Sequence, residues 1–123
     1  MAETNKGIET YYAKTRQHWR KWLEKNSEKK TAVYLILYHK GSTTKSVTYP
    51  EAVEEALCFG WIDSHKNNRD PESSYQKFSP RKPTSNWSES NKERVKRLIK
   101  DGLMTESGQK TIAIAKENGQ WDK

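Results

Sequence analysis

The segment TAVYLILYHK, residues 31–40, is a nearly continuous run of apolar and aromatic residues in a chain whose hydrophobic content is only 32%. Its Val, Ile, Tyr and Leu residues favour a strand, and a strand that is apolar on both faces lies inside a sheet. We therefore expect residues 31–40 to form a central strand that is buried on both sides.

The chain has 123 residues, which suits one domain of ordinary size. Its low apolar content is offset by 5 Trp, 6 Tyr and 2 Phe, because each aromatic side chain buries a large area. We expect a single domain over residues 1–123, with a small aromatic core, an ordered part of about residues 8–118 and frayed ends.

Apolar and aromatic side chains between Ile8 and Leu23 recur at spacings of three, four, seven and eight. This spacing predicts one helix with a single buried stripe. The stripe consists of Ile8, Tyr11, Tyr12, Trp19, Trp22 and Leu23.

Start and stop signals enclose a second helix in TYPEAVEEALCFG, residues 48–60. Thr48 and Glu51 have the spacing of a capping box, and Pro50 suits the first turn. Gly60 lies where a helix ends through a left-handed residue.

The remaining segments predict a hairpin followed by two helices. Residues 61–67 and 74–80 alternate in polarity and flank the turn NRDPES, whereas residues 41–47 form a loop or a short hairpin partner. Helices follow in residues 89–102, capped by Ser85 or Ser88, and in residues 103–119, capped by Thr105. The order α-β-(β)-α-β-β-α-α predicts an α+β fold, in which helices cover a small, mainly antiparallel sheet.

The hairpin also suggests a binding surface. If Ile62 faces the core together with Phe78, then Trp61, Asp63 and His65 share a more open face, and Tyr75 and Lys77 lie beside them. The loop that follows adds Arg81 and Trp87. The candidate ligand- or anion-binding residues are Trp61, Asp63, His65, Tyr75, Lys77, Arg81, Lys82, Ser85, Trp87 and Asn91.

Three interpretations of these residues remain open. Asp63 and Arg81 could form an ion pair that only fixes the loop, because bidentate pairs of this kind often hold geometry. Alternatively, the cations and aromatic rings could bind an anionic partner, either single-stranded nucleic acid or a phosphorylated or carboxylated small molecule. Exposed aromatic side chains would also suit a protein-interaction module.

No set of catalytic residues is predicted. Cys58, Asp63 and His65 could form a nucleophilic site, but a cysteine on an apolar helix face usually behaves as a small hydrophobe. The three histidines and Cys58 lack metal-ligand spacing, and the glycines form no phosphate-binding loop, so neither a metal nor a cofactor is expected.

Long stretches of the sequence resemble the YdeI/OmpD-associated family, also called the bacteriocin-protection family. The resemblance extends from about Tyr11 to Trp121 and is carried by YPEAVEEALCFGWIDS, YQKFSPRKPTSNWSESN and VKRLIKDGLMTESG. The first family block is matched by Glu51, Ala52, Glu55, Ala56, Leu57, Cys58, Phe59, Gly60, Trp61, Ile62 and Asp63. The second is matched by Tyr75, Phe78, Pro80, Arg81, Ser85, Trp87, Ser88 and Asn91. Ser64 replaces the usual Gly, and Lys77 replaces an Arg, which removes a bidentate fork there.

The resemblance implies a bacterial protein linked to tolerance of bacteriocins and envelope-active peptides. The net charge of +7 is concentrated in residues 1–40 and 76–100. We therefore expect a non-enzymatic stress protein that binds an anionic partner through a basic, aromatic-rich face. The alternative is an anionic-ligand site or an uncharacterised enzyme built on Asp63, Tyr75, Arg81 and Trp87.

The chain has no apolar signal core or membrane span and one cysteine, so we expect a cytoplasmic protein without membrane insertion.

Overall fold

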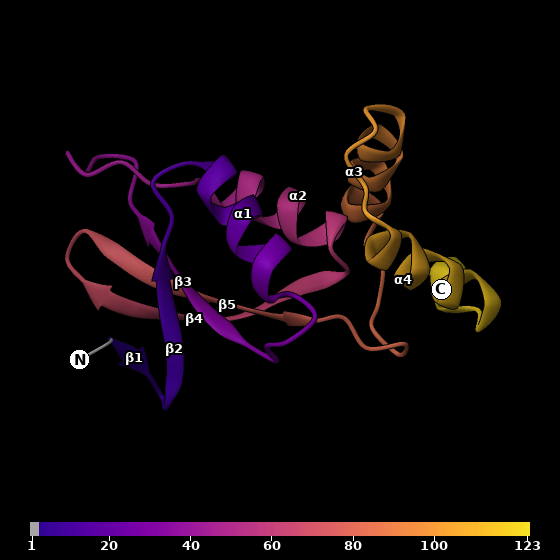
Figure 1. Cartoon of the computed structure of the whole chain (residues 1–123), viewed down its shortest axis with the longest axis horizontal. Coiled ribbons are helices and arrows are strands. Elements are labelled where there is room, and N and C mark those ends of the chain that lie inside the picture. Colours follow the sequence, from indigo (N-terminus) through magenta and orange to yellow (C-terminus); the bar gives the residue numbers. More distant parts are fainter. Residues whose placement is uncertain (1–2) are drawn as a thin grey trace.

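A computed structural model describes residues 3–123, which form one five-stranded sheet and a set of helices (Figure 1). The strands are β1 (Thr4–Asn5), β2 (Ile8–Tyr12), β3 (Val33–Tyr38), β4 (Trp61–Asp70) and β5 (Ser73–Pro80). The helices are α1 (Arg16–Asn26), α2 (Tyr49–Cys58), α3 (Glu89–Lys100), α4 (Glu106–Glu117) and the short 3-10 helix η1 (Gln120–Asp122). Regular structure therefore extends beyond the expected limits of residues 8 and 118.

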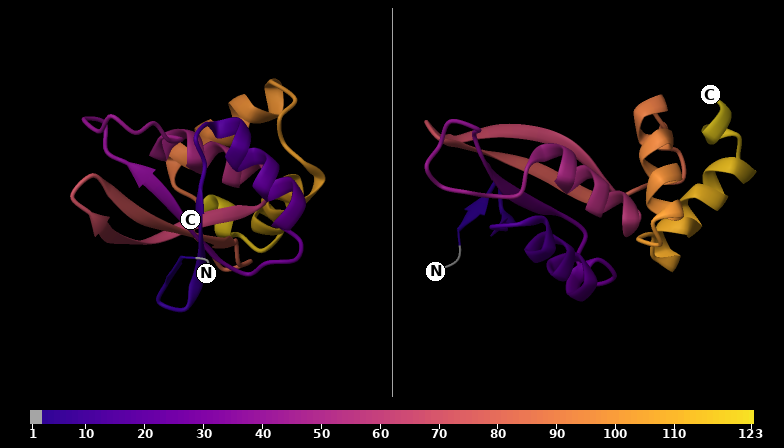
Figure 2. Two further views of the ribbon diagram at one scale, coloured as in Figure 1. Left: turned by 60° about the vertical axis from the view of Figure 1, so that its left-hand side comes forward. Right: turned by 90° about the horizontal axis from the view of Figure 1, so that it is seen from above.

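The α+β fold with a mainly antiparallel sheet is confirmed. The strand order is β1-β2-β3-β5-β4, and only the β2–β3 pair among these is parallel. Helix α1 connects these two parallel strands. Figure 2 shows α1 and α2 along one side of the sheet, with α3 and α4 beyond its end.

Strand β3 is the central strand that its composition predicts. Val33, Leu35 and Leu37 belong to the core shared with the helices. Tyr34 and Ile36 point to the opposite face, and both are also buried. The helices therefore cover only one of the two apolar faces of this strand.

The expected helix over Ile8–Leu23 is wrong in its first half. The segment IETYY forms strand β2, and α1 starts only after the cap residue Thr15, whose side chain accepts a hydrogen bond from the main-chain N–H of His18. Ile, Thr and Tyr favour strands, so the local preference of this segment agrees with the structure. The helical stripe is correct for Trp19, Trp22 and Leu23, which are the buried residues of α1.

The later elements follow their sequence signals. Thr48 and Glu51 form the capping box of α2, and Gly60 ends that helix region with a φ of 76°. Ser88, rather than Ser85, caps α3, and Thr105 caps α4. Residues 41–47 form a loop and add no strand.

Helix α4 packs end-on against the last turn of α2. The main-chain N–H and the hydroxyl of Thr105 both donate to the carbonyl oxygen of Cys58, at 3.0 and 2.5 Å. One turn later, Gly108 lies so close to α2 that an added Cβ would be 2.3 Å from that same oxygen. This close approach fixes where α4 sits.

Side chains of the two edge strands meet, which shows that the sheet is curled. Asn5 of β1 donates its side-chain amide to Asn67 of β4 at 3.1 Å. Glu3, just before β1, pairs with Arg69 of β4 at 2.8 Å. The curl covers the face of β3 that the helices leave open.

We expect Gly108→Ala to destabilise the protein by about 1–3 kcal/mol, because the methyl group overlaps backbone atoms that cannot turn away. Gly41→Ala is the matched control, since a Cβ added at Gly41 would have no other atom within 4 Å. Urea denaturation of both variants measures the difference. Equal stability of Gly108→Ala and wild type would contradict the close packing of α4 on α2.

Candidate functional site

Trp61 is a core residue, which corrects the expectation that it lines an open face. Its side chain is 1% exposed, and its ring meets that of Trp22 edge-on at 5.8 Å. The indole N–H donates to the carbonyl oxygen of Ser27 at 3.2 Å. Trp61 therefore has its polar atom satisfied and is unavailable for stacking on a ligand.

The register of the hairpin explains this correction. Phe78 lies opposite Asp63, so it shares the helix-covered face with Trp61, whereas Ile62 faces the other way. Tyr75 and Lys77 consequently lie on the sheet face away from the helices. His65 is exposed at a bulge between Asp63 and Lys66. The expected shelf of Trp61, Asp63, His65, Tyr75 and Lys77 is therefore divided between two faces.

Asp63 contacts α2 rather than Arg81. The hydroxyl of Tyr49 donates to the Asp63 carboxylate at 2.5 Å. Burial, and then this hydrogen bond, raise the pKa of Tyr49 to about 12. Asp63 and Arg81 form no ion pair among the described side chains, so the ion pair that could have fixed the loop is not the contact that holds it.

Arg81 is held inside the protein at the end of β5. Its Nη1 donates to the carbonyl oxygen of Asn86 at 2.9 Å, and its guanidinium carbon lies 4.0 Å from the ring centre of Trp87. The side chain thus fixes the loop of residues 81–87. Arg81 is only 8% exposed, and its Nε and Nη2 atoms are buried without a hydrogen-bond partner among residues 3–123.

Burial lowers the pKa of Arg81 to about 10, and the negative charge of Asp63 partly offsets this effect. The guanidinium is therefore still charged at neutral pH. It is a buried cation near a carboxylate that is bonded elsewhere. This makes the pair Nε and Nη2, called here the Arg81 edge, the most unusual polar feature of the site.

The other predicted residues of this region surround the loop. Ser85 accepts a hydrogen bond from the main-chain N–H of Lys82, whose side chain is exposed. Trp87 is buried and packs on Trp121 with ring centres 5.0 Å apart. Asn91 accepts a hydrogen bond from Arg94 at 3.0 Å.

Tyr49 and Arg94 are the two residues of this region that sequence reasoning missed. The charge of Arg94 lies close enough to lower the pKa of Tyr49, against the larger effects of burial and Asp63. Tyr49 comes directly after the cap of α2, and Arg94 lies on α3. No sequence pattern places Tyr49 beside Asp63 or Arg94 near Tyr49, because all three residues come from different elements.

A hollow adjoins Asp63 where the sheet extends past the start of α2. It consists of two overlapping cavities of about 400 and 250 Å³ that share Leu37, Tyr49 and Lys66. Val47 adds an apolar wall, and Lys40 adds a second cation. We call this cavity the Tyr49 hollow.

On the opposite face, Tyr75 contacts the N-terminal segment. Its hydroxyl donates to the carboxylate of Glu3, which also forms two hydrogen bonds with Arg69. These contacts, led by the one from Arg69, lower the pKa of Glu3 to about 2. The hydroxyl of Tyr75 is therefore occupied by Glu3, on the sheet face away from the helices.

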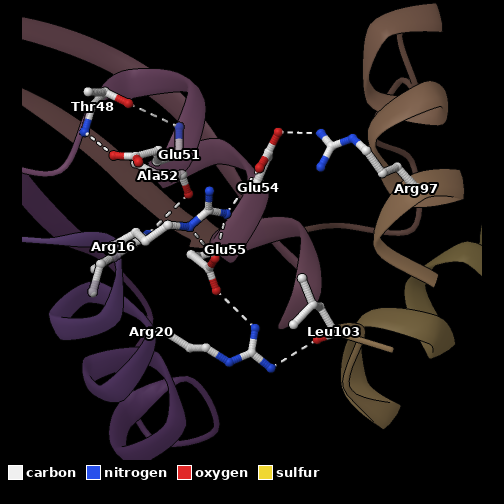
Figure 3. Close-up of polar contacts among 10 residues, drawn as sticks. Arg16, Arg20, Thr48, Glu51, Ala52, Glu54, Glu55, Arg97 and Leu103 are labelled. Atoms are coloured by element: carbon white, nitrogen blue, oxygen red, sulfur yellow. Dashed lines mark hydrogen bonds and ion pairs between the residues drawn. The ribbon is translucent and has the colours of Figure 1, made fainter. Parts of the chain in front are cut away.

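On the helix-covered side of the sheet, a network of charged side chains joins α1, α2 and α3 (Figure 3). The buried Glu55 accepts from Arg16 at 2.6 Å and from Arg20 at 2.9 Å. Glu54 bridges Arg16 and Arg97, which links α2 to α1 and α3 (Figure 3). All of these charges have partners, so the network is structural.

Other types of site lack support. Burial raises the pKa of Cys58 to about 11, which makes the thiol a poor nucleophile. No three His, Cys, Asp or Glu side chains gather as metal ligands within residues 3–123. None of the helices in the described part of the chain is both long and apolar enough to cross a membrane.

We expect Glu55→Gln to lower the free energy of unfolding by about 2 kcal/mol or more, because two arginines would lose a buried partner. Glu54→Gln is the control, with an expected loss of about 1 kcal/mol or less, since Arg16 would keep Glu55 and the other partner, Arg97, is half exposed. Urea denaturation compares the two variants. A larger loss for Glu54→Gln would contradict the structural role assigned to Glu55.

The contact between Glu3 and Arg69 should depend on pH. The pKa of Glu3 falls from its usual 4.5 to about 2 on folding, so its stabilising contribution is complete above pH 4.5. That contribution disappears as the pH falls towards 2. NMR signals of the Arg69 side chain should therefore show a titration step near pH 2 in wild type that is missing from Glu3→Gln.

Asp70 is a second carboxylate beside Arg69, and hydrogen bonding from Ser73 lowers its pKa. Asp70 is present in both wild type and Glu3→Gln, so only the difference between their titration curves reports on Glu3. Identical titration curves would contradict the assignment.

A model of a protein family described as a domain of unknown function (DUF8412) matches residues 11–111. The match runs from the end of β2 to the middle of α4 and so includes Tyr49, Asp63 and Arg81. No curated protein and no solved structure matches the chain. With most of its length matched, the chain belongs to the DUF8412 family of domains of unknown function.

Proposed function

We propose that the protein binds a small molecule that carries a carboxylate or a phosphate. The observation that carries this proposal is the Arg81 edge, two parallel N–H donors that are buried without a partner among the described residues. Parallel donors of a guanidinium match the two oxygens of a carboxylate or phosphate. The proposed ligand places its oxyanion there.

Two other arginines in the same protein show what this edge normally binds. Nε and Nη2 of Arg69 hold the two carboxylate oxygens of Glu3 at 2.8 and 2.9 Å. The same two atoms of Arg16 hold one oxygen of Glu55 at 2.9 and 2.6 Å. Arg81 is more deeply buried than either, yet its edge has no such partner among the described residues.

Electrostatics favour an anion at this position. A buried charge without a partner destabilises a protein, and this destabilisation is relieved when an opposite charge binds. Because the Arg81 edge is covered, the oxyanion reaches it only after neighbouring side chains move. Asp63 is the internal competitor, and its hydrogen bond with Tyr49 keeps its carboxylate away from the edge.

The Tyr49 hollow adjoins Asp63, whose charge acts on Arg81, and it offers the remainder of the ligand a place. Leu37 and Val47 provide an apolar surface, and Lys40 and Lys66 provide positive charge. A mainly apolar cavity with a few polar groups is the usual form of a small-molecule site. These features support a ligand with an apolar body and negative charge.

Nucleic acid is a weaker proposal for the anionic partner. Single-stranded nucleic acid needs exposed rings on which bases can stack, and Trp61 and Trp87 are both buried. With these tryptophans buried, the expected basic, aromatic-rich face lacks their stacking surface. The proposed partner is still an anion, and the Arg81 edge rather than a stacking surface binds it.

We further propose a stress-related role, based on the resemblance to the YdeI/OmpD-associated family. In this view, the protein is a non-enzymatic binding protein that contributes to tolerance of bacteriocins. Cys58 is free and buried, which is common in the cytoplasm, the compartment we propose.

Thermal unfolding tests the proposal with inorganic phosphate and acetate as probes, at an ionic strength held constant with sodium chloride. A ligand that binds only the folded state raises its melting temperature. We expect at least one probe to stabilise the wild type. Arg81→Lys should lose most of this shift, because Lys keeps the charge and lacks the parallel donors.

Lys82→Met is the matched control, since Lys82 is the exposed neighbour of Arg81 in the same loop. It should respond as the wild type does, and circular dichroism should show that both variants are folded. Equal responses of Arg81→Lys and wild type, or no response of the wild type, would overturn the proposal. Tight binding of a single-stranded oligonucleotide that weakens steeply with salt would favour nucleic acid instead.

A further inference from the structure

We propose that Arg69 and Tyr75 form a second site, which recognises a carboxylate and is filled by the chain's own Glu3. Its external ligand is an extended acidic segment of another chain, which takes the place of β1. The site lies on the sheet face away from α1 and α2, so it is separate from the Arg81 edge. This inference is independent of the proposed function.

Three donors converge on one carboxylate. Arg69 donates from Nε and Nη2 to the two oxygens of Glu3, at 2.8 and 2.9 Å. The hydroxyl of Tyr75 donates to one of the same oxygens. A planar, two-point contact completed by a phenol is a geometry suited to a carboxylate.

These donors are held by groups other than Glu3. Nη1 of Arg69 contacts Ser73 and Asp70, both at 3.1 Å, and the hydroxyl of Tyr38 at 3.4 Å. The ring of Tyr75 packs edge-on against Tyr34, which is 2% exposed, with ring centres 5.9 Å apart. The site is therefore preorganised, and a ligand would not have to order it.

Glu3 itself is attached by few contacts. Strand β1 has two residues, which pair with Ile8 and Glu9 of β2. Beyond these pairs, Thr10 donates to the carbonyl oxygen of Glu3 at 3.0 Å, and Asn5 donates to Asn67 at 3.1 Å. A segment that takes the place of so short a strand has few contacts to replace, and it would restore the cover of β3.

The chemistry of the external ligand follows from the contacts that Glu3 and β1 make. An external segment must supply a carboxylate to Arg69 and Tyr75, and backbone groups to the edge of β2. Addition of a strand to a sheet edge supplies affinity through the main chain, while one side chain in a fitting site supplies specificity. The ligand is therefore an extended peptide with a Glu or Asp at the position of Glu3.

The test uses the full-length protein with Glu3→Gln, which frees the site and keeps the size of the side chain. One probe is acetate, and the other is a synthetic peptide with the sequence of residues 1–9. NMR of the Arg69 Nε–H group follows binding. We expect saturable shifts in Glu3→Gln and at least about tenfold weaker binding in wild type, where the tethered Glu3 competes.

Adding Arg69→Lys to Glu3→Gln should abolish binding, because the parallel donors are lost. Adding Arg81→Lys instead should leave it unchanged, which separates this site from the one proposed above. The peptide should bind more tightly than acetate, and its version with Gln at position 3 should bind at least about tenfold more weakly.

Equal binding of acetate by wild type and Glu3→Gln would overturn the proposal, as would an unchanged Arg69 signal in Glu3→Gln. Tighter binding of inorganic phosphate than of acetate would overturn the assignment to carboxylates. A peptide that binds no more tightly than acetate would overturn the assignment to an extended segment.

Discussion

The burial of β3 on both faces is the constraint on which the rest of the structure depends. On one side, Val33, Leu35 and Leu37 share a core with the buried residues of α1 and α2. The other side, with Tyr34 and Ile36, is covered by the curl of the sheet. Because the curl brings β1 against β4, contacts that look like surface detail, such as Glu3 with Arg69, complete the cover of a central strand.

Local signals in the sequence are sufficient for most elements. The apolar run of β3, the capping box of α2 and the alternation in β4 and β5 all act over a few residues, and the structure confirms them. Strand β2 is mistaken for a helix because Ile8, Tyr11 and Tyr12 also fit a helical spacing. That ambiguity is resolved only by the parallel pairing of β2 with β3, which is a long-range contact.

The face of Trp61 could not be predicted for the same reason. Alternation shows that Trp61 and Ile62 point to opposite sides, and it does not show which side meets the helices. Contact with Trp22 of α1 decides the question. Sequence reasoning therefore selects Asp63, Arg81 and Trp87 correctly as neighbours of one region, places Tyr75 with them wrongly, and misses Tyr49 and Arg94.

The protein thus contains arginines that use the same atoms in different ways: Arg16 and Arg69 hold carboxylates, and Arg81 has no partner at that edge among the described residues. Proton–nitrogen NMR spectra of the arginine Nε–H groups, recorded with and without phosphate, test this contrast most directly. Phosphate should shift the Arg81 signal and leave those of Arg16 and Arg69 unchanged. An Arg81 signal that changes in Asp63→Asn but not with phosphate would indicate that Arg81 pairs with Asp63. That result would contradict the absence of a partner at the Arg81 edge.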